Sequence, residues 1–492
     1  MRIGVKFSLL AISEWIINRN TKYISINMKK IAAIIFSVLI VFTAFGQDIT
    51  GQWNGVLKVQ GTQLRIVFNI TKTGNVYSST MDSPDQGAKG IPVTTTTFEN
   101  TKLKLEIANF KIEYNGDFAD NTFTGTFKQS GMEFPLILTR DSVEEKPLIR
   151  PQEPVKPYPY YSEDVTFQNQ KANVTLAGTL TLPSKEGKFP VVILITGSGP
   201  QNRDEELLGH KPFLVISDYL TKNGIAVLRY DDRGTGQSTG DFKTATSVDF
   251  ASDVESAIEY LKTRQEIDKK KIGLMGHSEG GLIAPMLASR SGDVDFIVLL
   301  AGPGLRGDKI LLLQQELIAR ASGTPESEIL KSKEINTKAF EIVLNSKDEQ
   351  SLKAGLTKYI TETLKNNPGD DKPQGMSNDD FIALQVNRVT SPWMQYFIKY
   401  DPAPALEKVK CPVLAVNGAK DLQVPPKEDL SAINDALKKG GNKKVTTIEF
   451  PNLNHLFQEC NTGLPSEYSS IEQTFSPAAL DQITKWIQQQ VK

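Results

Sequence analysis

The stretch Lys271-Ile272-Gly273-Leu274-Met275-Gly276-His277-Ser278-Glu279-Gly280-Gly281 is the most informative segment of this chain. Its first part is typical of a short buried strand, and the apolar run 282–288 that follows it is typical of a helix. Between them lies Gly-x-Ser-x-Gly, which forms a tight strand-to-helix turn with small residues on either side of the serine. The segment therefore predicts that Ser278 is a nucleophile and that the backbone N–H of Glu279 binds an oxyanion.

A serine nucleophile needs a base, and histidine is the usual base near neutral pH. The chain has three histidines, His210, His277 and His455. His277 lies inside the turn, where its side chain should point away from Ser278, and His210 precedes the serine. In proteins with such a turn the acid and then the histidine follow the serine along the chain. His455 remains, in a loop after the β-rich run 444–450, and the alternative is an ordinary surface histidine.

The acid should lie between Ser278 and His455. Residues Pro412 to Val416 have the pattern of a buried strand, and the loop after it carries Asp421. A carboxylate there would accept the Nδ1–H of His455 and fix its tautomer, although a loop aspartate taken alone is more often solvated. Ser278, Asp421 and His455 are the predicted triad.

The second oxyanion donor should come from a loop after an earlier strand. The apolar run 189–195 ends in Thr196-Gly197-Ser198-Gly199-Pro200. We expect the N–H of Ser198 to be the donor, with Gly199 as the alternative and as a candidate substrate contact. A glycine-rich turn without any ligand is the other interpretation.

Three motifs together resemble one branch of the α/β hydrolases: Gly197-Ser198-Gly199-Pro200-Gln201-Asn202-Arg203-Asp204, the run Gly224 to Ser238 with Arg229-Tyr230-Asp231-Asp232-Arg233-Gly234, and Gly276-His277-Ser278-Glu279-Gly280. The branch comprises exported bacterial carboxylesterases, often labelled serine aminopeptidase-like hydrolases. The resemblance covers residues 160 to 492. It implies an eight-stranded, mostly parallel sheet with helices on both faces and a lid before the acid strand.

Ser278 and Asp421 are farther apart than one strand-helix-strand step needs, and residues 307–400 contain helical runs at 310–319, 351–364 and 379–389. These residues are predicted to form a helical cap over the serine, between hydrolase segments 161–306 and 401–492. Caps exclude water and shape substrate sites. Trp393 and Phe397 are candidate substrate contacts, although aromatic core packing is the commoner role of such residues.

Residues 47–141 have a different pattern, with short alternating strands at 64–70, 102–107 and 122–127. This pattern predicts a small all-β domain, barrel-like and similar to lipocalins, with either a ligand-binding or a structural role. A proline-rich linker, residues 142–160, should be extended and semi-rigid.

Residues 1–46 are interpreted as an upstream segment followed by a signal peptide that starts at Met28 and is cleaved after Gly46. The expected location is therefore periplasmic or extracellular, without a stable membrane anchor after cleavage. In such a compartment Cys411 and Cys460 either pair or remain two separate thiols.

The 492 residues include 56 basic and 57 acidic side chains, giving a net charge of −1. Without a basic stripe or a histidine/cysteine cluster, the sequence predicts no nucleic-acid partner, no metal and no cofactor. The leading hypothesis is a secreted hydrolase that cleaves small-molecule esters through an acyl-enzyme. The alternatives are an aminopeptidase or proline-directed peptidase with the same triad, and a binding protein whose functional part is the β domain. Composition does not determine the oligomeric state.

Overall fold

The computed structural model describes residues 48–59, 62–74, 76–86, 88–129, 132–141, 150–366 and 377–492. The expected signal peptide, with its start at Met28 and its cleavage after Gly46, lies outside these residues. Within the described residues, no helix combines the length and the apolarity needed to cross a membrane.

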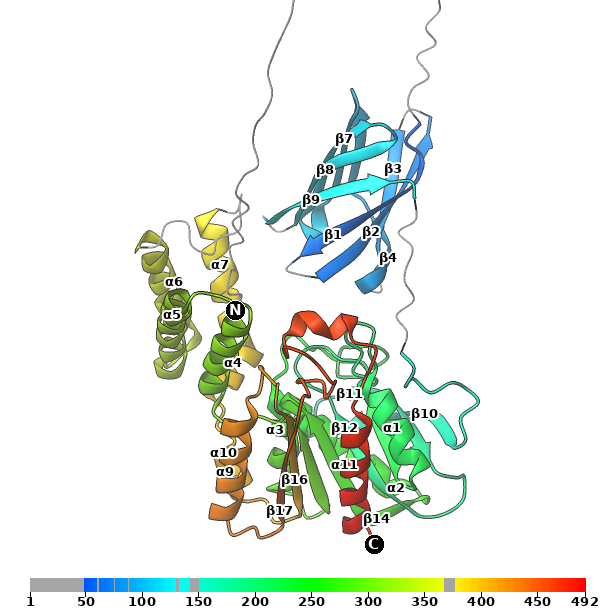
Figure 1. The fold of residues 1–492 in the computed structure, drawn as a ribbon, viewed down its shortest axis with the longest axis vertical. Coiled ribbons are helices and arrows are strands. Elements are labelled where there is room, and N and C mark those ends of the chain that lie inside the picture. Colours follow the sequence, from blue (N-terminus) through cyan, green and yellow to red (C-terminus); the bar gives the residue numbers. More distant parts are fainter. Residues whose placement is uncertain are drawn as a thin grey trace, which may run out of the picture.

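The N-terminal domain is a curled antiparallel sheet (Figure 1). Its described strands run in the order β4-β3-β2-β1-β9-β8-β7-β6-β5. Ser79 of β3 and Thr96 of β5 make a 2.6 Å hydroxyl contact, so β5, at one end of this order, meets the strand next to the other end, and the sheet is barrel-like. The strands are β1 (Gly51–Val59), β2 (Thr62–Thr73), β3 (Val76–Ser83), β4 (Ala88–Pro92), β5 (Thr95–Glu99), β6 (Lys102–Ile107), β7 (Ile112–Ala119), β8 (Thr122–Gln129) and β9 (Met132–Thr139).

Side chains fill the inside of this sheet. Alternate residues of its strands point inward, and they bury a group of large aromatic rings that includes Trp53, Tyr114 and Phe123. The ring centroids of Trp53 and Phe123 are 4.5 Å apart in an edge-to-face arrangement. A core of this kind stabilises the domain and favours the structural role over the binding of a ligand inside the barrel.

The second domain contains a sheet whose described strands run in the order β10-β11-β13-β12-β14-β15-β16-β17. The pairs β10–β11 and β11–β13 are antiparallel, and every later pair is parallel. This is the α/β-hydrolase fold, as predicted. The strands are β10 (Tyr161–Asn169), β11 (Val174–Leu182), β12 (Phe189–Ile195), β13 (Ala226–Tyr230), β14 (Ile267–His277), β15 (Phe296–Leu300), β16 (Val413–Gly418) and β17 (Val445–Phe450).

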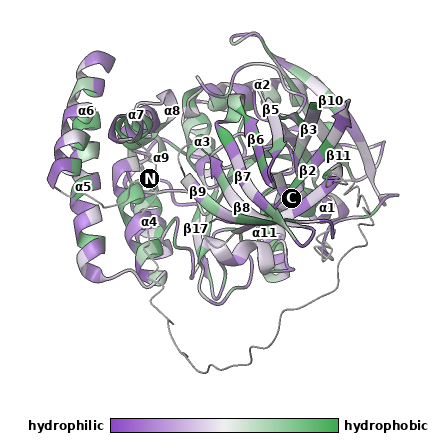
Figure 2. Cartoon of the chain, turned by 90° about the horizontal axis from the view of Figure 1, so that it is seen from above, coloured by the Kyte–Doolittle hydropathy of each residue, from purple (hydrophilic) through white to green (hydrophobic). Residues whose placement is uncertain are grey.

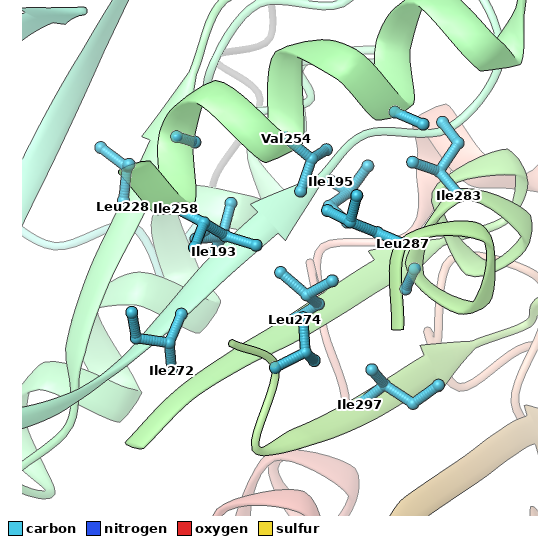
Figure 3. Packing of buried hydrophobic residues seen from close by; sticks show 14 of the residues in the cluster. Ile193, Ile195, Leu228, Val254, Ile258, Ile272, Leu274, Ile283, Leu287 and Ile297 are labelled. Carbon is cyan, nitrogen blue, oxygen red and sulfur yellow. The ribbon is translucent and has the colours of Figure 1, made fainter. Parts of the chain in front are cut away.

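Helices cover both faces of this sheet, and for that reason the buried parts of its central strands are largely apolar. On one face Ile193 of β12 and Leu274 of β14 pack beneath α2 and α3, which contribute Val254 and Leu287 (Figure 3). On the other face, side chains of the same strands pack against α1 and α11. These helices and their neighbours are α1 (Pro212–Lys222), α2 (Ser247–Thr263), α3 (Glu279–Ala288), α9 (Ala403–Leu406), α10 (Pro426–Lys439) and α11 (Pro477–Gln490).

A group of helices follows β15 and lies to the left of the sheet in Figure 1. They are α4 (Gly307–Ala321), α5 (Glu326–Asn345), α6 (Glu349–Asn366), α7 (Asn378–Val389) and α8 (Pro392–Lys399). Hydrophobic and hydrophilic residues alternate around α5 and α6 (Figure 2). The apolar residues, among them Phe340, Val343 and Leu356, form a core of their own. None of the three helical runs expected in this segment corresponds to α5. Most residues of this helix are polar, and its buried residues form only a narrow stripe.

The described part of the linker, residues 150–160, is fastened to the hydrolase domain. The Arg150 guanidinium donates to the carbonyl groups of Gly209 and Ile471, and Gln152 donates to the carbonyl group of Phe475. This part is therefore docked rather than a free spacer. Cys411 and Cys460 are both free thiols, so the structure favours the unpaired alternative.

Candidate active site

Ser278 occupies the turn between β14 and α3 with φ = 51° and ψ = −116°. L-residues other than glycine rarely adopt a positive φ, and such strain persists only where the surroundings impose it. Here the Ser278 N–H donates to the carbonyl oxygen of Leu300, at 2.8 Å. The turn lies at the carboxyl end of β14, next to β12, where the strand order reverses direction. Open α/β sheets bind ligands at this position.

The glycines around Ser278 are required by close backbone contacts. A Cβ atom on Gly276 would collide with the carbonyl oxygen of Gly280, and one on Gly280 would collide with the carbonyl oxygen of Ile195. The Gly-x-Ser-x-Gly pattern therefore follows from the space between α3 and the ends of β12 and β14.

We expect Gly280→Ala to destabilise the hydrolase domain by about 1–3 kcal/mol, because the added methyl group has no room against the Ile195 backbone. Urea denaturation of the variant would measure the loss. Gly292→Ala is the matched control, since nothing lies within 4 Å of a Cβ atom at that position. Equal stability of the two variants would contradict this account of the turn.

The predicted acid and histidine are in direct contact. Asp421 follows β16 and His455 follows β17, and the Nδ1–H of His455 donates to Asp421 Oδ2 at 2.8 Å. Asp421 Oδ1 accepts the backbone N–H groups of Gln423 and Val424 at 2.8 and 2.9 Å. Both side chains of the pair are buried. The Asp421 carboxylate is thus held from both sides, and it fixes the orientation of the His455 ring.

Backbone contacts fasten the acid loop to the histidine loop. The N–H groups of Ala419 and Lys420 donate to the carbonyl groups of Phe450 and Leu453 at 2.8 and 3.0 Å. Asn454, which is fully buried, accepts the N–H groups of Leu456 and Gln458 at its side-chain oxygen and thereby closes the turn that carries His455.

The loop after β12 is braced by two carboxylates. Asp232 accepts the Thr196 hydroxyl at 2.8 Å and the Gln201 N–H at 2.9 Å, while Glu205 accepts the Gly197 N–H at 2.7 Å. The Gly197 N–H is therefore already occupied. The next amide along the loop, the N–H of Ser198, is the candidate oxyanion donor. Burial raises the pKa of Asp232 well above its usual value.

The oxyanion loop lies beside the nucleophile. A Cβ atom on Gly197 would be 3.3 Å from the Cβ of Ser278. Glu279 is the first residue of α3, and the first N–H groups of a helix lack acceptors within the helix. The Ser198 and Glu279 amides therefore come from two segments that meet at Ser278, and their role as oxyanion donors remains a prediction. Gly199, which has a φ of 104°, continues the same loop.

The Glu279 side chain joins the nucleophile turn to the cap. Its Oε1 atom accepts the Ser247 hydroxyl at 2.5 Å and the Trp393 indole N–H at 2.8 Å, and burial raises the pKa of the carboxyl group. Phe397 stacks on Trp393, with ring centroids 5.1 Å apart, and packs against Leu282 of α3. Trp393 and Phe397, the two predicted substrate contacts, thus pack directly on α3, the helix that follows Ser278.

The other two histidines have different environments. The ring nitrogens of His277 contact Glu205 Oε1 and the carbonyl oxygen of His455, each at 3.0 Å. His210 is fully buried, where it contacts the Thr474 hydroxyl and the carbonyl oxygen of Tyr468, and burial lowers its pKa to about 4. Neither ring replaces His455 as the partner of Asp421.

Sequence reasoning assigned no role to Glu205 or Asn454. Both act through backbone groups in loops that only the fold brings to the site, so no local pattern distinguishes them from surface residues. The Asp231-Asp232-Arg233 run, by contrast, is part of a motif that carries the family resemblance. In the structure Asp231 binds Arg203 and Arg233 binds Asp253.

Comparisons with known proteins show similarity to hydrolases. The model of the X-Pro dipeptidyl-peptidase (S15) family matches residues 172–447. Esterase EstD of Thermotoga maritima is 26% identical over 334 residues, which are 67% of this chain and 69% of that protein. Among solved structures, the α/β hydrolase GrgF from Penicillium has a TM-score of 0.42 at 15% identity and covers 67% of this chain and 99% of its own. The Pyrococcus furiosus esterase Pf2001 has a TM-score of 0.39 at 16% identity, with coverages of 67% and 93%.

Proposed function

We propose that this chain, which belongs to the X-Pro dipeptidyl-peptidase (S15) family, is an exported serine hydrolase that cleaves carboxylic esters through an acyl-enzyme. Ser278 attacks the acyl carbon while His455 takes the serine proton and passes it to the leaving alcohol. The amides of Ser198 and Glu279 hold the negative charge of the tetrahedral intermediate. Water, activated by His455, then releases the acid and restores the Ser278 hydroxyl.

The proposal rests above all on the 2.8 Å contact between His455 and Asp421. A buried carboxylate that is held by two backbone N–H groups and receives the Nδ1–H of a histidine leaves the Nε2 atom of that ring as a proton acceptor. This is the tautomer that a base for Ser278 needs. The backbone of His455 is bonded to His277, the residue that precedes the nucleophile.

The occupation of the nearby carboxylates favours an ester over a peptide with a free amino terminus. An aminopeptidase needs carboxylates that bind the substrate's α-amine. Glu205, Asp232 and Glu279, which brace the oxyanion loop or follow Ser278, each already accept two groups from the protein. The similarity to EstD, which is an esterase by name, also supports ester hydrolysis.

The second candidate is a peptidase with the same triad. The description of the family, X-Pro dipeptidyl-peptidase, favours it. The fold and the Asp421–His455 pair serve both reactions equally, since amide and ester hydrolysis pass through the same kind of oxyanion.

We expect the enzyme to hydrolyse short-chain p-nitrophenyl esters and to leave alanine- and proline-arylamides intact. The assay compares kcat/KM of the purified protein on both substrate sets. The same activity, measured in periplasmic and medium fractions, also tests export. Arylamide turnover without ester preference would assign the peptidase reaction. Failure to turn over either set would contradict the proposal and favour a binding role for the β domain.

A further inference from the structure

Glu205 and His277 link the two sides of the candidate active site. Glu205 Oε1 lies 2.7 Å from the backbone nitrogen of Gly197 in the oxyanion loop and 3.0 Å from His277 Nδ1. The other ring nitrogen, His277 Nε2, lies 3.0 Å from the carbonyl oxygen of His455. The contacts therefore run from the oxyanion loop, through two side chains, to the backbone of the catalytic histidine.

The partners of His277 determine its protonation state. A carbonyl oxygen and a carboxylate oxygen are both acceptors, and a neutral imidazole has only one N–H to donate. Both contacts are satisfied together when the ring carries two protons and Glu205 is ionised. The charged and titratable groups around His277 are the carboxylates of Glu205 and Asp421 and the ring of His455, whose centroid is 4.9 Å away. Burial lowers the pKa of His277, but Glu205 and the other acceptors raise it, and the net shift is upward.

The pair is enclosed by the protein. Glu205 and His277 are 4% and 7% exposed, and Glu205 adopts a φ of 50°, which is unusual for a residue other than glycine. The small cavity beside them is otherwise lined by apolar side chains, including Phe213, Leu456 and Phe475. Burying two opposite charges gives little net stability, because desolvation offsets their attraction. Stability alone thus gives no reason for the pair. Its contacts with the oxyanion loop and with His455 indicate instead that it holds these two segments in place beside Ser278.

We propose that ionised Glu205 and protonated His277 form a buried ion pair that positions the oxyanion loop and the His455 loop relative to Ser278. The inference rests on the proposed hydrolase function, for which these loops carry the donor and the base. Neither side chain reacts with substrate: Glu205 acts through the Gly197 amide, and His277 acts through the His455 carbonyl group.

Histidine NMR tests the charge state without reference to catalysis. With only three histidines in the chain, ¹⁵N-histidine labelling gives three rings, and the His277 signals are assigned by their loss in His277→Gln. We expect both nitrogens of His277 to be protonated at pH 7 in the wild-type protein. A singly protonated His277 ring would overturn the proposal even if the protein hydrolyses esters.

Glu205→Gln tests the positioning role. The amide oxygen still accepts the Gly197 N–H, but without the carboxylate His277 loses its second proton and one of its two contacts. We expect kcat for p-nitrophenyl acetate to fall about 10- to 100-fold with KM nearly unchanged, since small displacements of catalytic groups have effects of this size. The His277 ring should become singly protonated at pH 7.

Glu206→Gln is the matched control, because Glu206 is the exposed neighbour of Glu205. It should leave both kcat and the His277 spectrum unchanged. A Glu205→Gln protein that keeps full kcat while His277 changes its protonation state would overturn the positioning role. Absence of ester and amide turnover in the wild type would instead refute the proposed function, and the NMR result would still decide whether the pair is charged.

Discussion

Replacing Ser278 by alanine should lower kcat/KM for p-nitrophenyl esters by about 10⁴- to 10⁶-fold, because the variant has no atom that can form the acyl-enzyme. The substitution removes a single oxygen from a half-buried side chain. The Ser278 backbone N–H still donates to Leu300, so the turn keeps its support. Steady-state kinetics on the purified variant measure the loss, and the melting temperature should stay close to that of the wild type.

Ser291→Ala provides the control, since Ser291 lies in the loop after α3, and its side-chain oxygen accepts the backbone N–H of its neighbour Asp293. It should keep wild-type activity. Retention of more than a tenth of the activity in a folded Ser278→Ala protein would exclude Ser278 as the nucleophile. The hydrolysis would then have to be assigned to another group.

The fold of the second domain could be predicted because its signals are local. The parts of β12 and β14 at Ile193–Ile195 and Leu274–Gly276 are apolar runs buried on both faces. The glycines beside Ser278 form a short motif that is visible in the sequence, although the contact that requires Gly280 is with the distant Ile195. The helix α5 had a weaker signal, since its buried residues Ile329, Asn336, Ala339, Phe340 and Val343 include a polar one and form a narrow stripe on a mostly polar helix. Its apolar stripe becomes evident only against α4 and α6.

The candidate site likewise contains contacts that the sequence predicts and contacts that it does not. The Asp421–His455 contact was predicted, because chain order and strand ends restrict where an acid and a histidine can meet. The contact of Glu205 with His277 depends on the path of the loop after β12, and no pattern in Asn202-Arg203-Asp204-Glu205-Glu206 distinguishes the buried acid from its exposed neighbour. The Trp393–Glu279 bond likewise joins residues more than a hundred positions apart. Such contacts arise from tertiary packing, and sequence spacing carries no information about them.

Asp421→Asn should lower kcat by about 10⁴-fold with little change in KM, because it reverses the tautomer of His455. Oδ1 of Asp421 accepts two backbone N–H groups, from Gln423 and Val424. In the variant the amide oxygen must occupy this position, since an NH₂ group there would face two donors. The NH₂ group is thereby directed at His455 Nδ1, which has to become an acceptor. The proton moves to Nε2, and the ring can no longer remove the proton of Ser278.

This prediction separates a catalytic aspartate from one that merely holds the loop. The backbone contacts of the acid loop survive in Asp421→Asn, so its melting temperature should remain near that of the control Asp435→Asn, in which an exposed carboxylate of α10 is neutralised. A loop-holding role predicts instead a lower melting temperature with kcat retained in the folded fraction. That result would remove Asp421 from the triad. A large loss of kcat at unchanged stability requires that the carboxylate act on His455, because that is the contact the substitution reverses.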